Sequence, residues 1–452
     1  MERHCFITIL PKVSLQMTML YDLDNERGFY EPGFLHLRIN TEKELVNFNE
    51  ILKNDKELFS TFFHEYIHFL QEITTPSGVM NSFHYIDFLK DIIGRIRAAD
   101  GFEFKVPIKP DNTANIVANQ QLRKIYAGDF RSTRYTRYDS FIQETEVVSD
   151  RDGKAYNVKK YKVFYYDLQT YASKTAYFGH TCLKEFVTHT LQKQFFPLIE
   201  HDDFPYTIAS QVMEREYPEF GNDPLHLVAY CDACLMFSHP AQLFFTLIEK
   251  MREKEFVPQK SADVYNFVYN TDIQFSGPMG KHDFSTLLFE SFSLAMSQFA
   301  DALKSNIFDS NRDWIFHMLL QGFRLRLERP HFITELVIGE GTFSPLFYQI
   351  LHNIGTPFFT DKKWKGGFVP PTNLTVIPNQ PYQLLGFQQF LHLFAGQRQC
   401  LLYKFCKTKP DRDITNHHCT TAPWLRATEE ELCPFGQLWK TWGLINKTPK
   451  WP

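Results

Sequence analysis

The chain lacks several features that would indicate its class directly. No run approaches the ~18 uninterrupted apolar residues that a membrane-spanning helix requires, and no long block of like charge occurs. P-loop, GxGxxG and GxSxG motifs are absent, so the sequence carries no common nucleotide-binding or serine-hydrolase signature. The net charge of -4 offers no electrostatic reason for binding nucleic acid or an acidic membrane. We therefore expect no nucleic-acid and no membrane partner.

A secretory signal is not evident either. The short apolar stretch near the start is broken by Pro11 and Lys12, and no small-residue cleavage site follows it. We therefore expect a cytoplasmic protein. In that compartment the eight cysteines should be reduced thiols or metal ligands rather than a disulfide framework.

The composition is that of an ordinary globular protein. With 452 residues and an apolar fraction of 44%, the chain can bury a large core and has the length of two to three domains. Helical spacing dominates, so the pattern predicts a mostly helical α+β fold. We expect three parts: residues 1–205 with an inserted β-hairpin region at about 100–175, a helical region at 206–365, and a C-terminal part at 366–452. The C-terminal part comprises a linker rich in Pro and Gly, one helix and a Cys-rich tail.

The most informative string is His64-Glu65-Tyr66-Ile67-His68, an HExxH motif within a predicted helix at 57–74. Two histidines four positions apart lie on one face of a helix, so both imidazoles can reach one tetrahedral metal ion. Glu65 is one step further round the helix, where it can serve as general base without binding the metal. The motif therefore predicts a zinc site with His64 and His68 as ligands and Glu65 as the catalytic base.

Two histidines leave the site one protein ligand short. The HExxHxxGxxH extension is absent, because Gln71 occupies the third position after His68. A Glu on a second helix is a common alternative third ligand. Two segments offer one: Glu185 follows Gly179 in a predicted helix, and Glu290 interrupts a strongly apolar helix. The residues alone leave both candidates open, and we favour Glu185.

The string HEYIHFLQ, from His64 to Gln71, resembles the active-site helix of zincin metallopeptidases of the gluzincin type. It is most similar to uncharacterised bacterial sequences that share an HEYxHxxQ string. In those sequences a later Gly-x-x-x-hydrophobic-x-Glu segment supplies the third ligand, and Gly179 to Glu185 match it. The resemblance implies a zincin-like catalytic core in residues 1–205 and His64, His68 and Glu185 as zinc ligands. The spacing departs from the family pattern. Gluzincins usually place the Glu much nearer the motif, whereas 117 positions separate His68 from Glu185 here.

The function implied by these residues is that of a zinc metallopeptidase with a protein or peptide substrate. Zinc would acidify a water molecule, and Glu65 would take the proton so that the hydroxide attacks a peptide carbonyl. A further donor should stabilise the oxyanion, and the sequence does not select among His189, His180 and Tyr177. The alternative is a zincin-fold binding or regulatory protein that has lost catalysis, but such a protein has no need of Glu65.

The last 53 residues hold four cysteines, Cys400, Cys406, Cys419 and Cys433. They could hold a second, structural zinc, although their spacing does not form the paired CxxC knuckles of common zinc modules. The remaining CxxC pair, Cys231 and Cys234, falls in a predicted apolar helix and is expected to be core rather than a redox site.

Overall fold

The computed structural model describes residues 27–31, 35–43, 45, 55–108, 114–130, 132–149, 153–273, 284–375, 383–407 and 413–451. Its helices are α2 (Lys56–Thr74), α3 (Pro76–Ala98), α4 (Ala114–Ala127), α5 (His180–Phe195), α6 (Asp203–Tyr206), α7 (Ile208–Glu216), α8 (Pro224–Leu235), α9 (Pro240–Glu253), α10 (Ser261–Asn270), α11 (Phe284–Ala302), α12 (Asp309–Glu328), α13 (Pro345–Ile354), α14 (Leu385–Phe394), α15 (Tyr403–Lys407), α16 (His418–Thr421) and α17 (Pro434–Thr441). Its strands are β1 (Gly28–Glu31), β2 (His36–Ile39), β3 (Glu103–Lys105), β4 (Thr136–Ser149), β5 (Ala155–Asp167), β6 (Ala172–Phe178), β7 (Val337–Gly339), β8 (Thr342–Phe343), β9 (Phe358–Thr360), β10 (Gly366–Gly367) and β11 (Thr448–Lys450).

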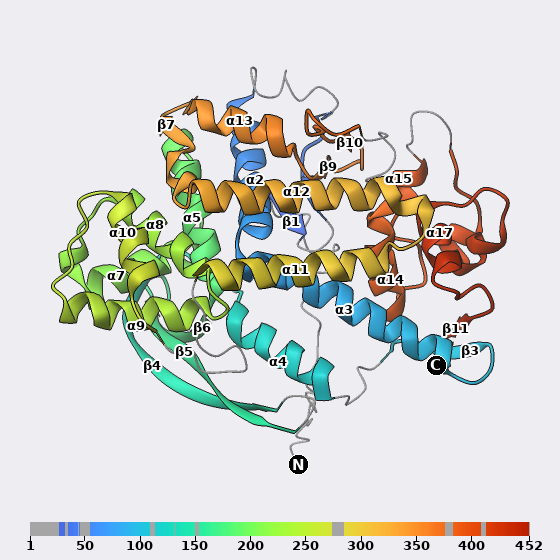
Figure 1. Ribbon diagram of the computed structural model, residues 1–452, viewed down its shortest axis with the longest axis horizontal. Helices are drawn as coiled ribbons and strands as arrows, with labels where there is room; N and C mark the ends of the chain where they lie inside the picture. Colours follow the sequence, from blue (N-terminus) through green and yellow to red (C-terminus); the bar gives the residue numbers. More distant parts are fainter. Residues whose placement is uncertain are drawn as a thin grey trace, which may run out of the picture.

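The helix with the HExxH motif, α2, packs against most of the other layers. It contacts β1 and β2 of the small mixed sheet and the helices α3, α5 and α12. In Figure 1, α11 and α12 run side by side across the front of the molecule, and α2 lies behind them at a steep angle. This central position explains why 15 of its 19 residues are buried.

Local sequence sets where α2 begins and ends. The Asp55 side chain accepts a hydrogen bond from the backbone N–H of Leu58 (3.0 Å), which caps the first turn. At the other end Thr75 leaves the helical conformation and caps α3 by accepting from the N–H of Gly78 (3.1 Å). Pro76 occupies the first turn of α3, where its missing N–H costs nothing.

Tertiary contacts hold the C-terminal end of α2 in place. A Cβ added at Gly322 of α12 would lie 2.1 Å from the carbonyl oxygen of Ile73, so α12 crosses α2 at backbone contact distance. The guanidinium of Arg326, also on α12, donates to the carbonyl oxygen of Thr74 (3.2 Å) and pairs with Asp232 of α8 (2.6 Å). Both members of this pair are fully buried. Removal of one partner would leave an uncompensated buried charge, which costs about 3–5 kcal/mol.

The strands join parts of the chain that are far apart in sequence. The four-stranded sheet has the order β1-β2-β9-β10, with β2 antiparallel to β1 and parallel to β9. Near the C-terminus, β11 pairs in parallel with β3. One large apolar cluster also contains residues from each of the three predicted parts, from Tyr30 to Leu444. Strand pairing and core packing therefore connect the first, second and third predicted parts.

The strands β4, β5 and β6 form an antiparallel meander at one side of the molecule (Figure 1). Its inner face is aromatic: Tyr161 stacks on Phe245 of α9 (4.5 Å between ring centroids), and Tyr165 stacks on Phe204 (5.4 Å). The chain leaves β6 at Phe178 and enters α5 after a single residue, Gly179. The meander thus leads directly into the helix that carries Glu185.

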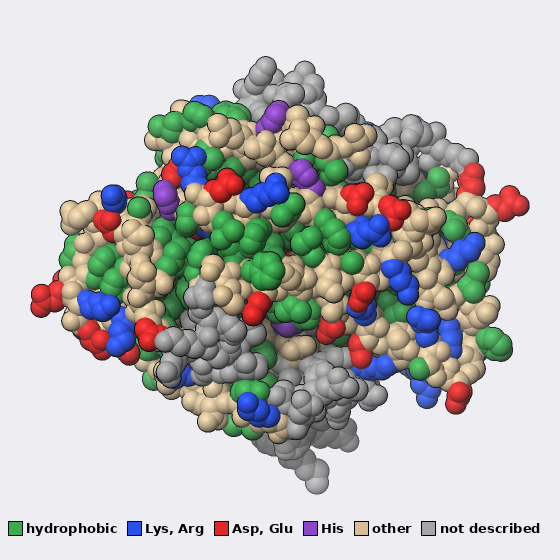
Figure 2. All heavy atoms as spheres, viewed as in Figure 1, with side chains coloured by type: hydrophobic (Ala, Val, Ile, Leu, Met, Phe, Trp, Pro, Cys, Tyr) green, Lys and Arg blue, Asp and Glu red, His purple; other side chains and the backbone are tan. Residues whose placement is uncertain are grey.

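The surface has one notable apolar region. Figure 2 shows hydrophobic side chains gathered over α11 and α12, where Phe289, Leu294, Leu320 and Leu327 are between 39% and 62% exposed. Within the described residues, no helix combines the length and the apolar character that crossing a membrane requires.

The predicted mostly helical α+β class is confirmed, with helices dominating the described part of the 206–365 region. The zincin-like core stays a prediction. Three local expectations need correction. The C-terminal part was expected to contain one helix, but its described residues contain α14, α15, α16 and α17. The region 100–175 contains the helix α4 as well as strands, and its hairpin is a three-stranded meander. The predicted linker at 366–382 begins with β10, which pairs with β9, because Gly366 has no side chain to block the close approach of Phe359.

Candidate metal centre

Helix α2 places His64, Glu65 and His68 in the interior. His64 is 5% and Glu65 is 6% exposed, and the His68 side chain is 13% exposed. The imidazole rings of His64 and His68 lie with their centroids 4.9 Å apart, as their four-residue spacing requires on one helix face. The motif therefore presents two imidazoles to one point in a largely buried setting.

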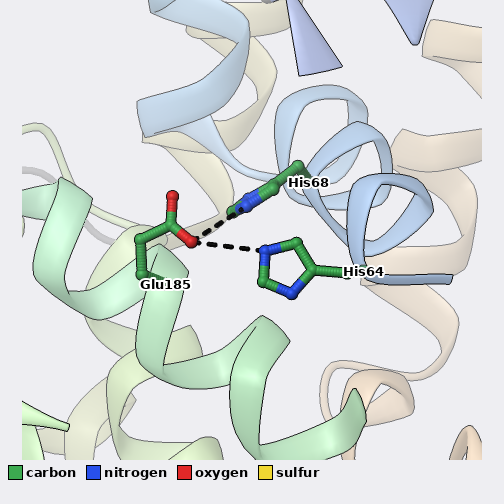
Figure 3. A group of neighbouring side chains, drawn as sticks. All are labelled: His64, His68 and Glu185. Carbon is green, nitrogen blue, oxygen red and sulfur yellow. Dashed lines mark ion pairs between the residues drawn. The ribbon is translucent and has the colours of Figure 1, made fainter. Parts of the chain in front are cut away.

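Helix α5 supplies the third side chain. Oε2 of Glu185 lies 3.3 Å from Nε2 of His64 and 3.3 Å from Nε2 of His68 (Figure 3). Within the described part of the chain, these three residues form the only group of three or more His, Cys, Asp or Glu side chains whose ligand atoms all lie within 4.8 Å of one another. The structure thus brings Glu185 to the two histidines across 117 positions of sequence.

The spacing of these atoms fits a zinc ion. Ligand atoms about 2.0–2.1 Å from zinc at tetrahedral angles are about 3.3–3.4 Å apart. The two distances of 3.3 Å match this value. In addition, Oε2 of Glu185 is buried and, apart from these two imidazoles, has no hydrogen-bond partner among the described residues. A buried carboxylate oxygen without a partner is costly unless a cation or a proton lies beside it.

Two glutamines orient the imidazoles. Oε1 of Gln192 lies 3.0 Å from Nδ1 of His64, and Oε1 of Gln71 lies 3.0 Å from Nδ1 of His68. The amide nitrogen of Gln192 donates to the carbonyl oxygen of Ser60 (3.0 Å), and that of Gln71 donates to the carbonyl oxygen of Lys184 (3.3 Å). Because these bonds assign each amide oxygen to the imidazole side, both Nδ1 atoms must be the N–H donors.

With the proton on Nδ1, the Nε2 atoms of both imidazoles are free to bind a cation. In a neutral imidazole with its proton on Nδ1, Nε2 carries a free lone pair. The two lone pairs of His64 and His68 therefore face Oε2 of Glu185. Three electron-pair donors that point at one another are held together only by a positive charge between them. Histidine ligands of metals are usually oriented in this way through their second nitrogen.

Without a metal, a proton takes the place of that charge. Burial lowers the pKa of His68, but its interaction with Glu185 outweighs burial and raises the pKa above its usual value. Burial likewise raises the pKa of Glu185, and the nearby imidazoles of His68 and His64 more than reverse this, so that the carboxyl pKa lies well below its usual value. The centre therefore keeps the carboxylate ionised and ready to receive a cation.

Glu65 lies beside this group without joining it. Burial raises the pKa of its carboxyl, while His64 and His68 oppose this effect in part. The backbone N–H of Tyr30 on β1 donates to this carboxylate. A carboxyl with a raised pKa is a better proton acceptor at neutral pH than an exposed one, which suits a general base.

Further polar rings lie on the α5 side of the centre. The His201 ring stacks on His64 (5.4 Å between centroids) and on Tyr206 (4.5 Å), and its Nε2 lies 2.9 Å from Oε1 of Gln192. His189 of α5 is 7% exposed and packs edge-on against His201 (5.0 Å). Of the three proposed oxyanion donors, His189 is therefore near the centre.

Tyr177 and His180, the other two proposed oxyanion donors, contact side chains outside the ligand group. The hydroxyl of Tyr177 donates to Glu144 of the meander (2.9 Å). The His180 ring is half-buried near Ser77, with Nδ1 3.5 Å from the Ser77 hydroxyl. Glu290, the alternative third ligand, is exposed on α11 and is not in the His64, His68 and Glu185 group.

The tail cysteines do not form a comparable group. All four are buried, and their exposed fractions are between 5% and 7%. Three of them, Cys400, Cys406 and Cys419, belong to a small apolar cluster with Phe358 and Trp364. Among the residues that the structure describes, no three of the tail sulfurs lie within 4.8 Å of one another. Cys231 and Cys234 are fully buried on α8, as expected of core residues.

Sequence reasoning missed Gln192, His201 and Tyr206. Gln192 had a usable signal, since it is seven positions after Glu185 and so lies on the same face of α5. His201 and Tyr206 had none, because they approach His64 only through the packing of α5 and α6.

Comparison of the chain with models of protein families, with curated proteins and with solved structures finds no match in any of the three.

Proposed function

We propose that the protein is a zinc-dependent hydrolase that cleaves peptide bonds. The observation that carries this proposal is the convergence of the Nε2 atoms of His64 and His68 on one buried oxygen, Oε2 of Glu185. Two imidazoles and one carboxylate are a donor set of catalytic zinc sites, which keep a fourth position open for water or substrate. A structural zinc site, in contrast, is closed by four protein ligands.

The residues around the centre have separate tasks in this proposal. A bound zinc ion supplies a Lewis acid that polarises the substrate carbonyl and acidifies water. Glu65 accepts the proton of the attacking water and passes it to the leaving amine. Gln192 and Gln71 keep the lone pairs of His64 and His68 directed at the metal position. The buried surroundings strengthen each of these electrostatic interactions.

The neighbouring strand supports a peptide as substrate. β1 is the end strand of its sheet in the described residues, and the N–H of its residue Tyr30 donates to Glu65. An extended peptide can add to the edge of a sheet through backbone hydrogen bonds. Such an edge beside the general base would hold a peptide with its carbonyl close to the reacting water.

The test compares the wild-type protein with Glu65→Gln. Zinc content is measured by elemental analysis, and hydrolysis is measured on a peptide library by mass spectrometry. We expect about one zinc per chain in both proteins, because Glu65 is outside the ligand group. Peptide cleavage should fall by about 100- to 10,000-fold in the variant, since a general base contributes that much.

Two outcomes would contradict this proposal in different ways. A purified chain that takes up no zinc at equimolar concentration is not a zinc enzyme. A chain that binds zinc but cleaves no peptide, with Glu65 or with Gln, would instead be a binding or regulatory protein with this metal centre. Equal cleavage by both proteins would mean that Glu65 is not the general base.

A further inference from the structure

A groove lies next to the metal centre, between α5 and α7. Its volume is about 380 Å³, within the usual range for ligand sites in proteins. Its floor is formed by Phe186 and His189 of α5, Met213 of α7, and Tyr217 and Leu227. All five are at most 7% exposed, so the floor is mainly apolar and well packed.

Helix α5 connects the groove with the metal centre. Glu185, His189 and Lys193 follow at intervals of four residues, which places them in one stripe on the helix. The first of these belongs to the ligand group, and the other two line the groove. The rings of His189 and His201 are in contact, and His201 in turn stacks on His64. The groove therefore begins one aromatic layer away from the metal position.

His189 gives the groove a polar feature in its interior. Its Nδ1 atom is buried and has no hydrogen-bond partner. Buried polar atoms are nearly always hydrogen-bonded in folded proteins. His189 lines the groove, so its imidazole is a polar group among the apolar residues of the lining.

The rim differs in character from the floor. Lys193, Glu214 and Asp223 line the groove and are exposed. A polar rim around an apolar floor is the usual arrangement of a site that binds a mainly apolar group. The mixed signs of the rim charges give no preference for a strongly acidic or a strongly basic ligand.

We infer that this groove is a specificity subsite that binds a bulky apolar side chain of the peptide substrate. This inference rests on the proposed peptidase function. Along a helix, His189 lies about 6 Å and Lys193 about 12 Å beyond Glu185. An extended peptide advances about 3.3 Å per residue. The groove thus receives the second to fourth residue from the cleaved bond.

The experiment profiles cleavage of a peptide library by the zinc-loaded full chain. Wild type should prefer Leu, Met or Phe over Ala at one position two to four residues from the cut. The preference in kcat/KM should be about tenfold or more, since one missing methylene in an apolar pocket costs about 10–200-fold. Met213→Phe, which fills part of the groove, should raise KM for the preferred peptides and so reduce the ratio of kcat/KM between them and the Ala-containing peptides.

The matched control is Met251→Phe, a change of the same size at a buried residue of α9 outside the groove. It should keep the wild-type preference. If Met213→Phe does not fold, Leu227→Phe and the wild-type profile itself provide the test. Cleavage with no preference at these positions, or with the same preference after the groove is filled, overturns this inference and leaves the peptidase function standing. A zinc-loaded wild type that cleaves no peptide overturns the proposed function and this inference with it.

Discussion

Two regions of the molecule concentrate side chains that can bind metals, and they differ in how these side chains are arranged. Between α2 and α5, His64, His68 and Glu185 come from distant parts of the chain, and their ligand atoms meet. In the tail, four cysteines lie within 34 residues of sequence and are all buried, yet their sulfurs do not gather in the same way.

The difference lies in the partners of each group. At the centre, the amide oxygens of Gln71 and Gln192 accept from the imidazoles, and their amide nitrogens donate to backbone carbonyls. Each ring is therefore held in one orientation. In the tail, three of the four thiols belong to a cluster of aromatic and aliphatic side chains. Burial raises the pKa of the Cys400 thiol well above its usual value, which favours the inert neutral form. Ligand residue types form a metal site only where further contacts orient them.

The largest expected effect follows from removing the carboxylate of the centre. Glu185→Ala should lower the zinc content of the purified protein from about one per chain to near zero, because it leaves two ligands. Cys406→Ala, the matched change in the tail, should leave zinc at about one per chain. Elemental analysis of both variants checks this. Loss of zinc from the Cys406 variant alone would show that the tail, rather than α2 and α5, holds the metal.

A smaller effect is expected from the residue that orients His64. Gln192→Ala should weaken zinc binding by about 10- to 100-fold, because the imidazole loses its acceptor at Nδ1. Gln194→Ala, on the same helix but without a bond to a ligand residue among the described contacts, is the control. Competition with a chromophoric chelator measures both affinities. Equal affinities in the two variants would mean that packing alone orients His64.

The pH dependence of zinc binding offers a third measurement. The pKa of His68 is raised in the metal-free centre, so a proton competes with zinc for it. Zinc affinity should therefore fall about tenfold for each pH unit below that raised pKa, and should level off above it. Chelator competition at a series of pH values between about 5.5 and 8.5, which includes the ordinary pKa of histidine, measures this slope.

The same pair sets how the metal-free protein responds to pH. Because the pKa of His68 is raised in the folded protein, its contribution to the free energy of unfolding is complete below the ordinary histidine pKa of 6.5. That contribution is lost as the pH rises through the raised pKa. Lowered pKa of Glu185 means that its contribution is present above 4.5 and is lost as pH falls. Chelated protein should thus show its largest gain from this pair at mildly acidic pH, and Glu185→Gln should remove that gain.

The smallest effect concerns the tail. Cys400→Ser should lower the free energy of unfolding by about 1–3 kcal/mol, since it places a hydroxyl among apolar neighbours. Chelation of zinc should leave the difference in thermal unfolding temperature between this variant and wild type unchanged. Were zinc bound in the tail, chelation would remove most of the difference between them, because both proteins would lose the same site.

Much of the local structure could be predicted. The bounds of α2 follow from the Asp55 cap, the apolar periodicity and Pro76, and the predicted helix at 57–74 differs from α2 by one residue. Helix α4 was missed, because its weakly apolar sequence lies among strands. The β10 strand was also missed, since Gly366 and Gly367 are typical of loops and pair only because β9 offers an edge to them.

His64, Glu65 and His68 were determined as a group by the sequence itself, because a helix converts a spacing of four residues into a shared face without help from the rest of the chain. The choice between Glu185 and Glu290 was not, since both are single acids on helices and nothing local distinguishes them. Only the tertiary structure distinguishes them: packing of α5 on α2 brings Glu185 within 3.3 Å of both imidazoles, whereas α11 leaves Glu290 exposed. The physical reason is that contacts between distant segments depend on how whole helices pack, which the spacing within one segment does not encode.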